Sequence, residues 1–112
     1  MALEHAHPGQ VIDVQPLGSN IPTAKTTALF KSTDLEVMRL VLAPGKSLPP
    51  HKVLGEITIQ CLEGYMEVTS EGKSHLLRAG QLLYLAGNAI HSVAALEDSS
   101  ALVTVALKNS QA

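Results

Sequence analysis

The feature that most constrains this chain is the stretch at 44–64, PGKSLPPHKVLGEITIQCLEG, where prolines and glycines bracket one histidine. Two adjacent prolines hold the backbone extended as it leads into His51, because each ring fixes φ and lacks an N–H donor. After a short turn, residues 56–61 alternate polar and apolar side chains, which predicts a half-buried strand. Gly64 then supplies a turn. The stretch therefore predicts extended chain on both sides of the histidine.

The rest of the chain repeats this short-strand pattern. Turn residues recur about every eight to twelve positions, and no window carries the periodicity of an amphipathic helix. We predict about ten short strands, and hence an all-β antiparallel sandwich or barrel. The predicted strands are residues 11–14, 25–30, 35–42, 49–51, 56–61, 65–70, 75–77, 81–85, 90–95 and 101–107.

The chain has the length of one domain, which we place at residues 10–112 after an N-terminal tail at 1–9. Residues 82–85 of the strand predicted at 81–85 are apolar on both faces. Because the outer face of a one-domain barrel is normally polar, we expect a second copy or the N-terminal strand to cover it. A charged fraction of 16%, low against about 25% for an average domain, also favours a homodimer.

Composition excludes several function classes. The net charge is −2 and no run of Lys or Arg occurs, so the basic stripe that nucleic-acid binding needs is absent. No apolar stretch approaches the ~20 residues of a membrane helix, and the N-terminus lacks the apolar region of a secretory signal. Cys61 is the single cysteine, which excludes an internal disulfide and fits a reducing compartment. We expect a cytoplasmic protein without nucleic-acid or membrane partners.

Two glycine–histidine frames together resemble the two conserved motifs of the cupin superfamily. Gly45, His51 and Gly64 stand where the first motif, G-x5-H-x-H-x3,4-E-x6-G, requires them. Gly80 and His91 stand where the second motif, G-x5-P-x-G-x2-H-x3-N, requires them. The resemblance covers most of the chain and is to small single-domain, RmlC-like cupins. It implies a double-stranded β-helix, a jelly-roll barrel with a pocket at one mouth.

The resemblance also shows where this chain departs from metal-binding cupins, in which three histidines and a glutamate hold the ion. Val53 stands at the second histidine position and Ile57 at the glutamate position, whereas His51 and His91 are retained. Catalytic zinc and non-haem iron sites typically use three protein ligands. We therefore expect a degenerate metal site at His51 and His91, binding Fe, Mn, Ni or Zn weakly. The expected ligand pocket consists of His51, Val53, Ile57 and His91.

Two residues near this frame, Glu56 and Cys61, carry other groups that can ligate a metal. Glu56 is one residue from the family's glutamate, so on a regular strand it points to the opposite face. A β-bulge at residues 54–55 would be needed to turn its carboxylate inward. Cys61 shares the inward parity but lies ~13 Å further along the strand, so we interpret it as a small buried hydrophobe.

Three functions remain open from the sequence. The preferred one is a cupin that binds a small organic ligand in its barrel, with no assigned reaction. The alternative is a divalent-metal-dependent oxygenase or isomerase that uses His51 and His91. The third is metal-free acid–base catalysis by one of these histidines. No G-x-S-x-G, P-loop or Rossmann signature occurs, and the sequence assigns neither substrate nor ligand.

Overall fold

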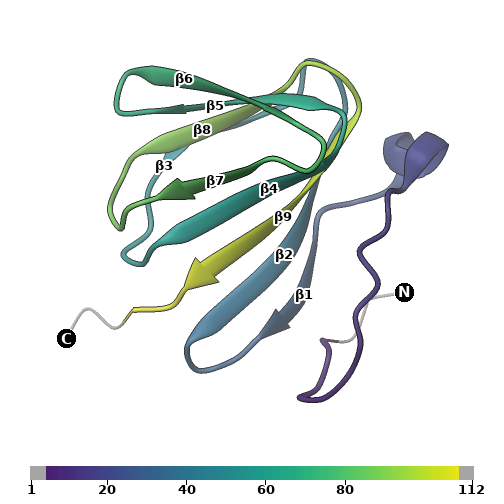
Figure 1. Ribbon diagram of the computed structural model, residues 1–112, viewed down its shortest axis with the longest axis vertical. Coiled ribbons are helices and arrows are strands. Elements are labelled where there is room, and N and C mark those ends of the chain that lie inside the picture. The colour runs from purple at the N-terminus through teal and green to yellow at the C-terminus, as the bar shows by residue number, and fades with distance from the viewer. Residues whose placement is uncertain (1–4, 109–112) are drawn as a thin grey trace.

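The computed structural model describes residues 5–108 and places nine strands in two antiparallel sheets that face each other (Figure 1). The five-stranded sheet has the order β1-β2-β9-β4-β7, and the four-stranded sheet has the order β3-β8-β5-β6. A short 3₁₀ helix, η1 (Gly18–Thr23), precedes the strands. The strands are β1 (Thr27–Lys31), β2 (Leu35–Leu42), β3 (Ser47–His51), β4 (Ile57–Glu63), β5 (Tyr65–Ser70), β6 (Lys73–Arg78), β7 (Leu82–Leu85), β8 (His91–Ala95) and β9 (Ser99–Ala106).

The predicted all-β antiparallel fold is confirmed, and nine of the ten predicted strands are present with ends shifted by at most two residues. The prediction of a strand at residues 11–14 is wrong. There the Asp13 carboxylate accepts the N–H of Gln15 at 2.9 Å, a local turn that replaces ladder pairing. Within the described residues, no helix has the length and apolar character to span a bilayer.

The core lies between the sheets and follows the period of two. In β4, Ile57, Ile59 and Cys61 point inward with exposed fractions of 4%, 1% and 0%. Met66 and Val68 of β5 meet them from the other sheet and are fully buried. Each such aliphatic side chain contributes roughly 1.5 to 3 kcal/mol on burial, so the alternation seen in the sequence is what holds the sheets face to face.

The two sheets meet at one end of the molecule and diverge toward the other, as Figure 1 shows. At the closed end, the turn between β4 and β5 contains Gly64 with φ of +89°. A Cβ atom there would lie 2.1 Å from the carbonyl oxygen of Asp98 in the turn between β8 and β9. Glycine is therefore required for the two turns to pack together.

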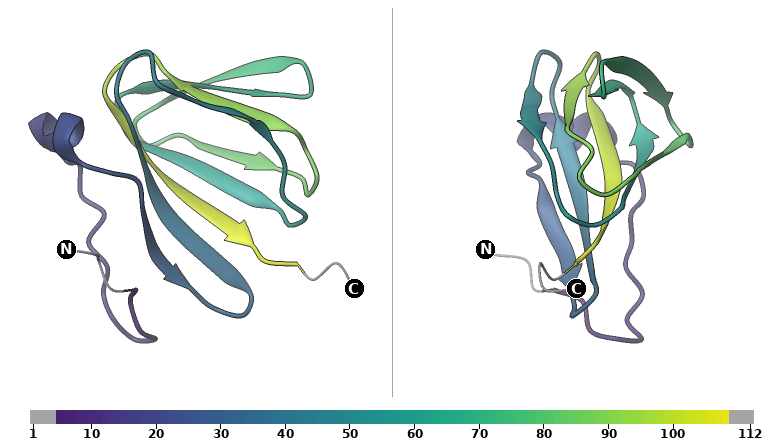
Figure 2. Two further views of the ribbon diagram at one scale, coloured as in Figure 1. Left: turned by 180° about the vertical axis from the view of Figure 1, so that it is seen from behind. Right: turned by 90° about the vertical axis from the view of Figure 1, so that its left-hand side faces the viewer.

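The N-terminal segment lies beside β1 at the edge of the five-stranded sheet, as Figure 2 shows. The Ala6 N–H donates to the Leu29 carbonyl at 2.8 Å, so part of the predicted tail is attached; residues 1–4 lie outside the described residues. Further along, the Arg39 guanidinium donates to the Gln15 carbonyl at 2.8 Å and is only 7% exposed. The segment thus covers the outer face of β2.

The same segment is bound by the carboxylate of Glu63, which accepts the N–H groups of Leu17 and Gly18 at 2.8 and 2.9 Å and the hydroxyl of Ser100. Partial burial acts to raise the pKa of Glu63. The three hydrogen bonds and the nearby positive charge of Arg39 outweigh it and lower that pKa. Glu63 is therefore held as a carboxylate beneath the N-terminal segment.

The expectation that the N-terminal strand covers residues 82–85 is wrong, since Leu82 and Tyr84 are each 59% exposed in the described structure. The N-terminal segment covers β2, which the strand order separates from β7 by β9 and β4. Cover by a second copy of the chain stays a prediction.

Candidate ligand-binding site

A cavity of about 490 Å³ lies between the sheets at the end where they diverge. Small-molecule pockets in proteins occupy about 300 to 1,000 Å³, so the cavity has a suitable size. His51, Val53, Ile57 and His91 all line its wall. The structure therefore brings together the four residues that the sequence places in a pocket, from segments that lie far apart in the chain.

The two histidines form a cross-strand pair. His51 ends β3 and His91 begins β8, and the antiparallel register sets them directly opposite each other. Their ring centroids are 4.3 Å apart and the ring planes are tilted by 55°. His91 is 4% exposed, whereas His51 lies at the open end and is exposed.

Both rings are held by the same local contact. The Nδ1 atom of His51 lies 3.1 Å from the carbonyl oxygen of Pro49, and that of His91 lies 3.0 Å from the carbonyl oxygen of Ala89. Because a carbonyl oxygen can only accept, the Nδ1 atom in each neutral ring carries the proton. This assigns the tautomer from the hydrogen-bond partner and leaves both Nε2 atoms as acceptors.

The loops that carry the histidines are tied to each other. The Asn88 N–H donates to the Val53 carbonyl at 2.8 Å, and Asn88 itself has a φ of +65°. At Gly87 a Cβ atom would lie 2.3 Å from the Leu54 carbonyl oxygen, so glycine permits this close approach. The contacts fix the position of residues 52–55 relative to the turn before His91.

The donor set at this site is small. Among the described residues there is no group of three or more His, Cys, Asp or Glu side chains placed to hold a metal ion. Apolar Val53 and Ile57 line the cavity beside the two histidines. Two imidazoles do not make the three-ligand set of catalytic zinc and non-haem iron centres, so the residues present do not fit a tight catalytic metal site.

Glu56, the substitute ligand nearest to the family's glutamate position, does not reach the cavity. Glu56 lies on the outer face, where its carboxylate accepts the hydroxyl of Tyr84 at 2.9 Å. This hydrogen bond, and then the negative charge of Glu56, raise the pKa of Tyr84. The bulge that would turn Glu56 inward is absent, because Ile57 keeps regular register with Leu85 and Val105.

Cys61 lies in the core away from the cavity, as the interpretation of a small buried hydrophobe requires. Its thiol donates to the Glu63 carbonyl at 3.4 Å. Burial raises the pKa of the thiol, so Cys61 is held neutral and is not placed to ligate a metal.

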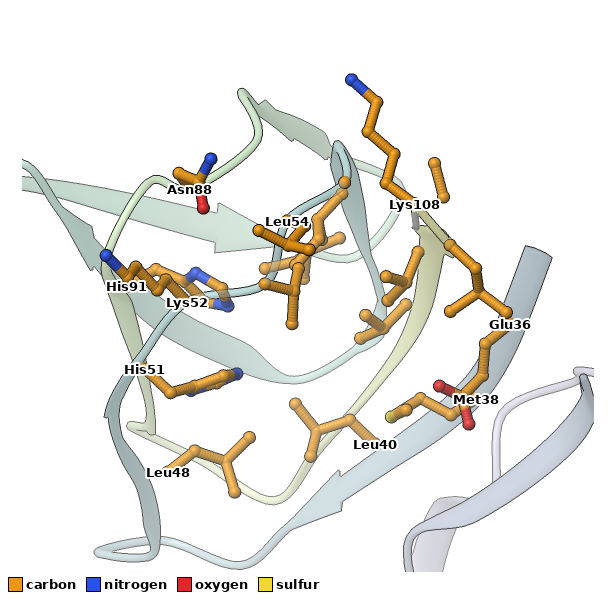
Figure 3. Close-up of a pocket in the computed structure, with 18 of the residues that line it drawn as sticks. Glu36, Met38, Leu40, Leu48, His51, Lys52, Leu54, Asn88, His91 and Lys108 are labelled. Carbon is orange, nitrogen blue, oxygen red and sulfur yellow. The ribbon is translucent and has the colours of Figure 1, made fainter. Parts of the chain in front are cut away.

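Several cavity residues were not singled out from the sequence. The apolar wall includes Met38, Leu40, Val103 and Val105. The alternation of apolar and polar side chains in β2 and β9 is the sequence signal that predicts their inward position. Lys52, which follows His51 directly, also lines the cavity. Figure 3 shows Lys52 and Asn88 at the end that holds the histidines, and Glu36 and Lys108 on the opposite side.

The comparisons with known proteins agree with this architecture. The family model of the cupin domain matches residues 38–107, which is more than half of the chain, so this protein belongs to the cupin family. A search of curated proteins finds no match.

Solved structures show the same fold. A conserved protein of unknown function from Streptococcus pyogenes is 17% identical, with a TM-score of 0.75, over 98% of this chain and 97% of its own. An RmlC-like cupin protein from Desulfovibrio desulfuricans is 27% identical, with a TM-score of 0.67, over 72% and 79%. An RmlC-like cupin from Methanocaldococcus jannaschii with a double-stranded β-helix fold is 19% identical, with a TM-score of 0.72, over 88% and 93%. The chain is thus a small double-stranded β-helix of the cupin family, as its two sequence frames predict.

Proposed function

We propose that this protein binds a small organic molecule in the cavity between its sheets. The carrying observation is a cavity of about 490 Å³ with an apolar wall and one polar end, where two imidazole rings leave their Nε2 atoms free. Ligand pockets characteristically combine a mostly apolar lining with a few polar groups that fix orientation. The apolar wall supplies affinity, at roughly 25 cal/mol per Å² of surface removed from water, and the histidines orient the ligand.

A test combines ligand screening with a filled cavity. Wild-type protein is screened by thermal shift and by methyl NMR against small organic molecules, and organic extracts of the purified protein are analysed by mass spectrometry. Leu40→Trp places an indole in the cavity and is expected to abolish the shifts, because Leu40 lines the wall and is 3% exposed. Leu42→Met is the matched control, since Leu42 is buried in the same strand but does not line the cavity.

Loss of binding in Leu40→Trp with retention in Leu42→Met supports the proposal. Absence of any ligand for the wild-type protein, or binding that survives Leu40→Trp, refutes it. Should Leu40→Trp fail to fold, Val103→Phe from the neighbouring strand β9 gives the same comparison.

A second candidate function, a divalent-metal-dependent oxygenase or isomerase, is favoured by one observation. Both Nδ1 atoms are engaged by carbonyl oxygens, which leaves two Nε2 lone pairs at neighbouring rings. The test is the metal content of untagged protein beside a His51→Ala/His91→Ala variant, which also controls for the exposed His5 and His7. Near-stoichiometric Fe, Mn, Ni or Zn that the variant loses supports this candidate, whereas metal absent from both proteins refutes it.

We further propose a cytoplasmic location, because the free thiol of Cys61 is suited to a reducing compartment. We also propose that the chain forms a homodimer in which the second copy covers the outer face of β7. The support for the dimer is the 59% exposure of both Leu82 and Tyr84. Light scattering is expected to give a dimer mass that Leu82→Glu reduces to a monomer mass. Leu76→Glu, at a residue 51% exposed on the other sheet, is the matched control. A monomeric wild-type protein, or equal effects of the two variants, contradicts the dimer.

A further inference from the structure

One nitrogen atom of the cavity wall has no partner among the described residues. His91 is 4% exposed, and its ring is on the inward side of β8, where Val93 and Ala95 share its parity. The Nδ1 atom of His91 faces the Ala89 carbonyl at 3.0 Å, and no described residue donates to the Nε2 atom. That atom is not fully enclosed, since Arg39 Nε is the only fully buried side-chain nitrogen or oxygen without a partner in the described structure. The Nε2 atom of this buried ring is therefore open to the cavity.

His51 places a second acceptor beside the first. The two ring centroids are 4.3 Å apart, and the Nδ1 atom of His51 faces the Pro49 carbonyl, so its neutral ring also leaves Nε2 as an acceptor. Figure 3 shows both rings directed from their strands into the space beside Leu40. His51 is exposed, so water can donate to its Nε2 atom, whereas His91 is buried. A ligand in the cavity must therefore supply the hydrogen-bond donor for His91.

The charges that line the cavity favour a neutral donor. Glu36 is the only carboxylate among the described lining residues, and Figure 3 shows it on the side opposite the histidines. A cationic head group beside His91 would be removed from water without a counter-charge, which is strongly unfavourable. A carboxylate only accepts, so it has no proton for a neutral imidazole. Lys52 is exposed, so its ammonium can stay in water and needs no partner from a ligand.

Among neutral donors, a hydroxyl group matches this end of the cavity best. An amide brings its own carbonyl oxygen, which needs a donor, whereas the free ring atoms of His51 and His91 are both acceptors. A hydroxyl group donates its proton to Nε2 with a single polar atom. Its oxygen can in turn accept from water at the open end, where His51 is exposed.

We propose that the ligand of this cavity is an apolar molecule with one neutral hydroxyl group, an alcohol or a phenol, that donates to Nε2 of His91. This inference rests on the proposed ligand-binding function. The body of the ligand lies against Leu40, Ile57, Val103 and Val105, whose side chains have no hydrogen-bonding atoms. The cavity of 490 Å³ equals the volume of roughly 16 water molecules at about 30 Å³ each, so it admits an alcohol of about nine non-hydrogen atoms.

The test compares four probes of similar size, titrated at neutral pH into the full chain: 1-octanol, heptyl methyl ether, octanoate and octylammonium. The ether has as many non-hydrogen atoms as 1-octanol but lacks the hydroxyl proton. Dissociation constants are measured by methyl NMR or calorimetry. We expect 1-octanol to bind most tightly, and about threefold to tenfold more tightly than the ether, the effect of one hydrogen bond.

Variants of His91 test which atom accepts the proton. His91→Leu removes the acceptor and is expected to reduce the preference for 1-octanol over the ether about threefold to tenfold. His75→Leu, in β6 and outside the cavity lining, is the matched control and is expected to leave that preference unchanged. Should His91→Leu fail to fold, His91→Asn gives the same comparison, because its amide can still donate to the Ala89 carbonyl but has no acceptor at the Nε2 position.

Nitrogen NMR of the imidazole rings in the wild-type protein gives a second measurement. The Nε2 resonance of His91 is expected to shift when 1-octanol is added and to stay unchanged with the ether. An unchanged resonance with both probes refutes the hydrogen bond to His91.

The outcomes separate the ligand class from the proposed function. The hydroxyl class is refuted, while ligand binding stands, if another probe binds as tightly as 1-octanol or if His91→Leu and His75→Leu change the preference equally. If none of the four probes binds, the hydroxyl class is refuted. If the wider screen of organic molecules also finds no ligand, the proposed function is refuted with it.

Discussion

Replacement of Glu63 by glutamine tests how the N-terminal segment is held. The carboxylate accepts three hydrogen bonds, from the N–H groups of Leu17 and Gly18 and from the Ser100 hydroxyl. In Glu63→Gln one acceptor oxygen becomes an NH₂ donor that faces another donor. The buried guanidinium of Arg39 also loses the nearby negative charge of Glu63.

The size of the effect follows from these contacts. Hydrogen bonds to a charged group contribute roughly 1.5 to 3 kcal/mol each when buried, but contacts open to solvent contribute only about 0.2 to 1 kcal/mol. Glu63 is half-buried, so solvent screening reduces the sum. We expect Glu63→Gln to lower the free energy of unfolding by about 1 to 3 kcal/mol in urea denaturation. The matched control is Glu67→Gln on the other sheet, whose carboxylate accepts the Ser74 hydroxyl near the surface and whose loss is expected to cost under about 0.5 kcal/mol.

The pH dependence has a defined sign. The folded state lowers the pKa of Glu63 below its ordinary value of 4.5, so the stabilisation is fully present above that value. It is lost as the pH falls below 4.5 through the folded-state pKa, and the difference between wild type and Glu63→Gln shrinks accordingly. Hydrogen exchange at the amides of Leu17 and Gly18 reports the same contact locally and is expected to be faster in the variant. Unchanged exchange there, or a stability difference that persists undiminished in acid, would refute the reasoning.

Three further changes test the turns, the outer face and the core. Gly64→Ala is expected to lower the melting temperature far more than Gly72→Ala. Both glycines have positive φ, but only at Gly64 would a Cβ atom meet a backbone atom, at 2.1 Å. Equal losses of melting temperature would contradict the close approach. The pKa of Tyr84 is raised by Glu56, so Glu56→Gln is expected to bring the phenol's ultraviolet titration down toward its ordinary value; an unchanged titration would contradict the contact. The fully buried Cys61 thiol, whose pKa burial raises, is expected to react with a disulfide reagent only after denaturant is added, and rapid reaction of native protein would place it at the surface.

Local pattern accounts for most of the fold. The period of two in β4 and β5 assigns Ile57, Ile59, Cys61, Met66 and Val68 to the interior, and the structure agrees for each. The pattern works there because burial on one face of a strand depends on parity alone. It fails at residues 11–14, where Val11, Ile12 and Val14 are apolar but a turn at Asp13 satisfies the backbone instead.

The sequence pattern does not predict contacts between residues that are far apart in the chain. Strand parity places Arg39 on the face of β2 opposite to Met38 and Leu40, yet nothing local indicates that the carbonyl of Gln15 covers it. At the site, parity alone indicated that Glu56 points away from the cavity, as its contact with Tyr84 shows. The tautomers of the histidines were not predictable, because they depend on where the carbonyl oxygens of Pro49 and Ala89 lie.

The polar end and most of the apolar wall of the cavity belong to different sheets. His51 and His91 come from β3 and β8 of the four-stranded sheet, whereas Leu40, Val103 and Val105 come from β2 and β9 of the five-stranded sheet. Substitutions in the second set reshape the space for a ligand's body without touching the strand pair that aligns the imidazoles. Ligand selectivity can therefore change through substitutions in one sheet alone. Residues of the five-stranded sheet set the shape of the apolar space, while the four-stranded sheet keeps the histidine pair in place.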